Sequence, residues 1–201
     1  MTDRYEGLVK FSGDPVAKIL SRANIILKTP LEAPPSATAP VVLEELESKA
    51  ALVDLLRVLP ALLPPRERVW WACLAARDYV GPKSEKDPPP LSAAEAWVFE
   101  PTDEHRTQAS TAMDQALVDD DTVHCAMAAL YADGTLGPGD LAQHPAPAGA
   151  SETAAFAMNM VALGELSDKF EEHSKLLIER ALDIARGGSG RITAETSKEE
   201  A

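Results

Sequence analysis

The chain has 201 residues, near the upper limit of one ordinary domain, and its formal charge of −13 comes from 32 acidic and 19 basic residues. An acidic surface repels nucleic-acid phosphates and anionic lipid head groups. The densest basic stretch, Arg66 to Arg77, has only three arginines, with Glu67 among them. We therefore exclude nucleic acid and membranes as partners. No segment reaches the ~18 apolar residues of a membrane span, and no apolar signal core begins the chain, so we expect a cytoplasmic protein.

Residues 1–28 are predicted to contain one helix that begins at Asp14-Pro15, where the aspartate caps the helix and the proline takes its first position. Residues 29–42 follow as a proline-rich linker of extended character. Two interpretations of residues 1–28 stay open. The helix either docks on a partner or packs on its own domain.

Residues 43–187 are predicted to form one helical core domain. Hydrophobic fraction is 45% but aromatic content only 5%, and a core of Ala and Leu favours helix packing over a sheet. Periodic apolar positions, caps and prolines predict helices over about 43–59, 65–80, 92–99, 102–117, 119–131, 151–163 and 167–186. With the N-terminal helix this gives about eight helices and no sheet, in an all-α compact bundle or array of helical hairpins. Residues 188–201 are predicted to be a disordered acidic tail.

The adjacent tryptophans Trp70 and Trp71 are the most informative feature of the sequence. Consecutive helical residues diverge by about 100°, so both rings cannot easily share one core-facing stripe. One ring is therefore predicted to border a protein-binding groove, with Arg66 and Arg77 nearby and Trp97 completing the cluster. The alternative is a buried helix with two large core-filling side chains. Under the groove hypothesis, Trp71→Ala weakens partner capture and leaves thermal unfolding nearly unchanged.

Catalytic, metal and cofactor sites are not predicted. The four histidines and the two cysteines, Cys73 and Cys125, lack the spacing of a zinc site, and no nucleophile elbow or phosphate-binding loop occurs. Asp119-Asp120-Asp121 lacks the glycine and the distal glutamate of a calcium loop. An enzyme with a site around His124 and Cys125 stays as the third hypothesis.

The block Arg66-Glu-Arg-Val-Trp-Trp-Ala-Cys-Leu-Ala-Ala-Arg77, followed by Ala94-Glu-Ala-Trp-Val-Phe-Glu-Pro101, resembles a family of roughly 200-residue proteobacterial proteins with no assigned activity. The resemblance covers about residues 43–187 and implies an association with type VI secretion gene clusters. We therefore expect a non-catalytic adaptor or chaperone-like accessory protein, whose partner is another protein such as a secretion component or effector. A structural or assembly subunit of a larger complex is the alternative. The sequence does not predict the oligomeric state.

Overall fold

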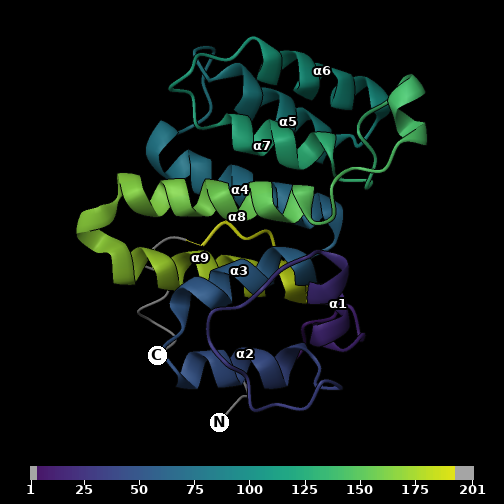
Figure 1. Ribbon diagram of the computed structural model, residues 1–201. Coiled ribbons are helices and arrows are strands. Elements are labelled where there is room, and N and C mark those ends of the chain that lie inside the picture. The colour runs from purple at the N-terminus through teal and green to yellow at the C-terminus, as the bar shows by residue number, and fades with distance from the viewer. Residues whose placement is uncertain (1–3, 193–201) are drawn as a thin grey trace. The chain divides into compact units, whose positions relative to one another are not determined.

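The computed structural model describes residues 4–192, so most of the tail predicted over 188–201 lies outside the described residues (Figure 1). Within that range the chain forms nine α-helices and no β-strand, which confirms the all-α prediction. No helix in the described range is long and apolar enough to cross a membrane. The chain divides into two compact units. Unit 1 combines Met1–Pro64 with Asp168–Ala201, and unit 2 is Pro65–Ser167.

Unit 1 is built from four α-helices. They are α1 (Val16–Arg22), α2 (Ala39–Ser48), α3 (Leu52–Leu62) and α9 (Phe170–Arg186), and α3 packs against each of the other three (Figure 1). A short 3-10 turn over Ser167–Lys169 precedes α9. The fully buried large side chains of this unit are mainly leucines: Leu43, Leu46, Leu55, Leu56, Leu59, Leu63, Leu177 and Leu182.

The helix predicted over 43–59 is in fact two helices, α2 and α3, which accounts for the ninth helix. The chain turns at Ala50, whose φ of 51° lies in the left-handed region, and the N–H of Ala51 donates to the carbonyl of Leu46 over 2.9 Å. Alanine is the strongest helix former and pays about 1–2 kcal/mol for this conformation, so nothing in the local sequence indicates a break.

Most of the predicted linker is fixed to unit 1 by hydrogen bonds. The Glu45 carboxylate accepts from the N–H of Glu32 and, over 2.9 Å, from that of Ala33. Lys49 Nζ donates to the Pro30 carbonyl over 2.8 Å. Residues 39–42 are already the first turn of α2. In unit 1, the N-terminal helix α1 packs on α3 and buries Val16, Ile19 and Leu20.

Unit 2 contains the other five α-helices. They are α4 (Pro65–Val80), α5 (Pro89–Phe99), α6 (Asp103–Asp114), α7 (Val123–Leu130) and α8 (Ala150–Glu165), with a 3-10 turn over Gly139–Gln143. Helix α8 lies along α4 and α7, while α5 packs on α4, α6 and α7 (Figure 1). Ten of the sixteen buried residues in its apolar cluster are alanines. Small side chains let helix axes approach closely, so unit 2 is held together by close helix contact.

Candidate protein-binding site

The two adjacent tryptophans of α4 lie in different environments. Trp71 is fully buried, whereas Trp70 is half-buried and packs against the apolar cluster of unit 2. This divergence follows from the 100° rotation between neighbouring helical residues. A fully buried ring offers no surface to a partner, so Trp71 fits the core-filling alternative and only Trp70 reaches the surface.

The two aromatic residues near the end of α5 lie in different environments. Trp97 is buried in the apolar cluster of unit 2, but Phe99, the last residue of α5, is 85% exposed. Backbone and side-chain contacts fix this helix end. The N–H of Glu100 donates to Ala96 O over 2.9 Å, and His105 Nδ1 lies 2.7 Å from Glu100 O. Phe99 is therefore exposed from a well-defined backbone.

Arg66 joins the start of α4 to the end of α5. Its Nε donates to the carbonyl of Val98 over 2.6 Å, directly beside Phe99. Trp70 follows Arg66 by one helical turn and so lies on the same face of α4. We call Arg66, Trp70, Val98 and Phe99 the Phe99 surface. It combines an exposed aromatic ring, a half-buried tryptophan and an exposed guanidinium group.

Arg77 has a structural role at the other end of α4. Its Nε donates to Glu95 Oε1 over 2.7 Å, and its Nη2 lies 2.6 Å from Asp87 Oδ2 and 2.8 Å from Glu95 Oε2. The Arg77 guanidinium lowers the pKa of the Asp87 carboxyl to about 2. Arg77 thus ties the 81–88 loop and α5 to α4. The structure does not bring it together with Arg66 and Trp70 on one surface.

Cys125 and its neighbour His124 diverge on α7. Cys125 is fully buried and its thiol is hydrogen-bonded to that of Cys73 on α4; neither forms a disulfide. This hydrogen bond and burial raise the pKa of the Cys73 thiol, which keeps it protonated. His124 is half-buried, and its Nδ1 has no hydrogen-bond partner within residues 4–192. In the same range no group of three or more His, Cys, Asp or Glu side chains is placed to hold a metal ion.

Comparison with known families matches residues 42–185 to the model of a family of unknown function, DUF6931. The chain belongs to this family. The match covers nearly the same residues as the resemblance seen in the tryptophan block. No curated protein and no solved structure matches the chain.

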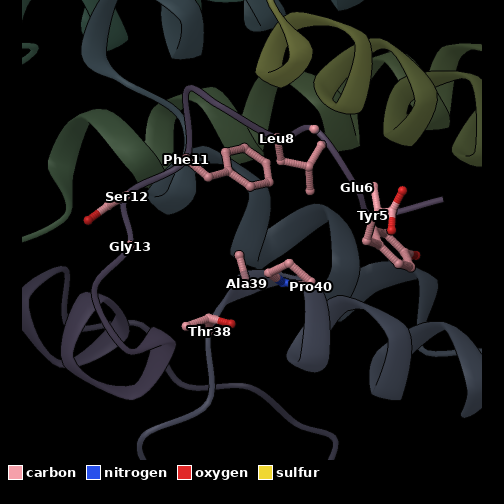
Figure 2. A pocket seen from close by; sticks show the side chains of 10 residues that line it. Tyr5, Glu6, Leu8, Phe11, Ser12, Gly13, Thr38, Ala39 and Pro40 are labelled. Carbon is pink, nitrogen blue, oxygen red and sulfur yellow. The ribbon is translucent and has the colours of Figure 1, made fainter. Parts of the chain in front are cut away.

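The DUF6931 segment includes every residue of the Phe99 surface, but it excludes the residues around a cavity in unit 1. This cavity has a volume of about 360 Å³ and is lined by residues 5–8, 11–13 and 38–40. Figure 2 shows Leu8 and Phe11 on one side, Ala39 and Pro40 on the other, and Tyr5 with Glu6 at one end. All of its lining residues precede residue 42, so the family match does not extend to them.

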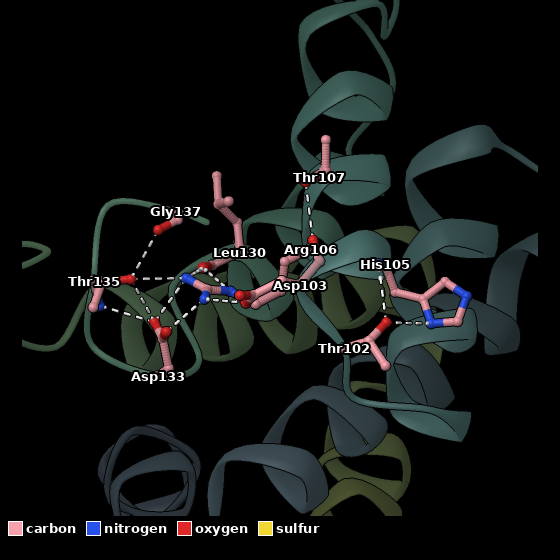
Figure 3. A network of polar contacts seen from close by, with 9 residues as sticks. All are labelled: Thr102, Asp103, His105, Arg106, Thr107, Leu130, Asp133, Thr135 and Gly137. Carbon is pink, nitrogen blue, oxygen red and sulfur yellow. Dashed lines mark hydrogen bonds and ion pairs between the residues drawn. The ribbon is translucent and has the colours of Figure 1, made fainter. Parts of the chain in front are cut away.

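The DUF6931 segment also contains a buried arginine that was not predicted from the sequence. Arg106 of α6 is almost fully buried and closes the end of α7: its Nε and Nη2 donate to Leu130 O over 3.1 and 2.9 Å. Its Nη2 also donates to Asp133 Oδ1 over 2.7 Å and to Thr135 Oγ1 over 2.9 Å (Figure 3). The partners lie 24 to 29 residues away, and no local spacing rule links them. Arg106 therefore fixes the start of the long 131–149 loop.

Proposed function

We propose that this chain is a non-catalytic, protein-binding adaptor or chaperone-like accessory protein that binds its partner through the Phe99 surface. The observation that carries the proposal is the 85% exposure of Phe99 on a fixed helix end. Burying such a ring against a partner contributes about 1.5–3 kcal/mol. Aromatic residues and arginine are enriched in protein interfaces, and both are present on this surface.

The charge of unit 2 supports a basic partner. Residues 65–167 contain sixteen Asp and Glu but only six Lys and Arg, so this unit carries −10 of the total charge of −13. A potential of this sign steers positively charged proteins toward the surface and disfavours acidic ones. The resemblance of the tryptophan block supports a type VI secretion component or effector as this partner.

Affinity capture from the native host tests the proposal. The tagged full chain is compared with Phe99→Ser and with a matched control, Ile26→Ser, which removes an 82% exposed apolar side chain from unit 1. We expect Phe99→Ser to reduce recovery of a specific protein about tenfold, the effect of losing about 1.4 kcal/mol. Ile26→Ser should retain it, and all three proteins should melt at similar temperatures. Equal recovery with Phe99→Ser would contradict the proposal.

A second candidate function is that of a structural or assembly subunit. Apolar side chains are also exposed on unit 1, where Val9 is 77% and Ile26 82% exposed. A subunit buried in a larger complex would cover such positions. Light scattering on the purified chain separates the two: a monomer at micromolar concentration favours the adaptor, and a defined oligomer that Ile26→Ser dissociates favours the subunit.

A further inference from the structure

A second exposed apolar position lies at the opposite end of α6 from Phe99. The predicted helix over 102–117 ends early, at Asp114, and Leu117 and Val118 fall in the following turn. Leu117 is 75% exposed and Val118 is fully exposed. We call residues 117–121 the Leu117 turn.

The backbone of the Leu117 turn is held by local hydrogen bonds. The N–H of Asp120 donates to Leu117 O over 3.0 Å, and the N–H of Val123 donates to Asp120 O over 3.2 Å. The Asp120 carboxylate accepts from the backbone N–H of Thr122 over 3.0 Å, and Thr122 is itself buried. Two adjacent apolar side chains are thus exposed on an ordered support, which lowers the entropic cost of binding.

The surroundings of this turn are acidic. Asp114, Asp119 and Asp121 are exposed, and within residues 4–192 no cation forms an ion pair with any of the three. The sequence contains no Lys or Arg between Arg106 and Lys169. The Leu117 turn, with two exposed apolar side chains and negatively charged surroundings, is complementary to an apolar groove with a positively charged rim. A second copy of the same acidic surface would be repelled.

We infer that the Leu117 turn is a second docking surface, which inserts Leu117 and Val118 into an apolar groove rimmed by Lys and Arg on a partner protein. The inference rests on the proposed adaptor function and adds the chemistry of a partner. Helix α6 has 12 residues, and at 1.5 Å per residue it separates this turn from the Phe99 surface by roughly 18 Å. Two surfaces at this separation let one chain contact two proteins, or two parts of one.

Site-specific photo-cross-linking in host extract tests this inference. The full chain carries a photoreactive benzoylphenylalanine in place of Val118, and the cross-linked peptide is identified by mass spectrometry. We expect a peptide whose neighbouring surface is rich in Lys and Arg. Leu117→Ser should reduce the yield about tenfold, and so should raising the salt to about 0.5 M, which screens the charges. Asp119→Asn with Asp121→Asn should also lower it, whereas the control Asp140→Asn, an exposed aspartate elsewhere in unit 2, should not.

Several outcomes overturn the inference. They are the absence of any cross-link, a cross-link to another copy of this chain, a cross-link to a neutral or acidic surface, and a yield that does not depend on Leu117 or on salt. The variants change exposed side chains, and an unchanged circular dichroism melting curve verifies that each is folded. If Phe99→Ser abolishes capture of a partner while Leu117→Ser changes neither capture nor cross-linking, the second surface fails and the adaptor function stands. If neither variant has an effect, both proposals fail.

Discussion

Unit 1 and unit 2 contain the same number of acidic residues but use their basic residues differently. Each has sixteen Asp and Glu, but unit 1 has thirteen Lys and Arg and unit 2 only six. In unit 1, cations such as Lys18 and Lys175 pair with carboxylates at the surface. In unit 2, the side chains of Arg68, Arg77 and Arg106 are largely buried and paired with carboxylates. The acidic surface of unit 2 therefore follows from its small number of cations, half of which are largely buried arginines in ion pairs.

The apolar cores of the two units differ as well. Leucines fill unit 1, and alanines make up most of the apolar cluster of unit 2. Alanine buries little area per residue, so unit 2 gains less from each core position. A few large buried side chains and the buried arginines should then matter more in unit 2.

Removal of the Trp71 ring should have the largest effect on the free energy of unfolding. Because Trp71 is fully buried, Trp71→Ala leaves a cavity and should lower the free energy of unfolding by about 3–5 kcal/mol. Phe99→Ala, which shortens an exposed side chain of the same unit, should change it by less than about 0.5 kcal/mol. Urea titration followed by circular dichroism measures both. Equal stability of Trp71→Ala and the wild type would support the groove hypothesis for that residue.

Arginine substitutions should give the next largest difference between the two units in the free energy of unfolding. Arg106→Met removes the side-chain donor to the carbonyl of Leu130 and the cation paired with the Asp133 carboxylate, and should cost about 1–3 kcal/mol. Arg22→Met breaks an exposed ion pair with Asp14 in unit 1 and should lower the free energy of unfolding far less than Arg106→Met. The same urea titration is used. A comparable loss in both variants would show that burial of the cation does not distinguish the units.

The smallest expected effect is on the pH dependence of the melting temperature. The pKa of Asp87 in unit 2 is lowered to about 2 by Arg77, and the pKa of Glu45 in unit 1 to about 2 by Lys49. A carboxyl group whose pKa is lower in the folded state than in the unfolded state stabilises the fold. This stabilisation is fully present at a pH above the unfolded-state pKa, here 3.8 for Asp87 and 4.5 for Glu45, and it is lost as the pH falls through the folded-state pKa of about 2. Melting temperatures measured from pH 5 to about pH 2 should therefore fall less steeply in Asp87→Asn and in Glu45→Gln than in the wild type. If the melting temperatures of the variants and the wild type fell in parallel with pH, the lowered pKa values of Asp87 and Glu45 would be contradicted.

Local sequence patterns predicted both ends of α4, which a proline and a glycine mark, but they misplaced two helix starts: α5 begins at Pro89 and not at residue 92, and α7 begins at Val123 and not at residue 119. Helix α4 begins at Pro65 and ends before Gly81, as expected from these residues. Local sequence patterns did not predict helix breaks and ends that depend on tertiary contacts. Ala50 is in a left-handed conformation within an apparently continuous helix, and α6 ends at Asp114, three residues before the predicted end.

The candidate site could be predicted only in part. Helical rotation correctly separates Trp70 from Trp71, but it cannot say which ring is buried, because that depends on neighbouring helices distant in sequence. Phe99 is only two residues from Trp97, and local spacing does not show that Arg66 donates to the carbonyl of Val98. Sequence reasoning therefore located the correct helices, α4 and α5, and misjudged the exposure of individual side chains on them.

The division of unit 1 between Met1–Pro64 and Asp168–Ala201 has a consequence for synthesis on the ribosome. Helix α3 packs against α9, which begins only at Phe170, whereas every residue of unit 2 has been made by Ser167. At roughly 5–20 residues per second, α9 is completed about one to four seconds after unit 2. During that interval the leucine face of α3 lacks its partner helix. The nascent chain should then depend on a chaperone or on rapid closure by α9, and unit 2 should fold first.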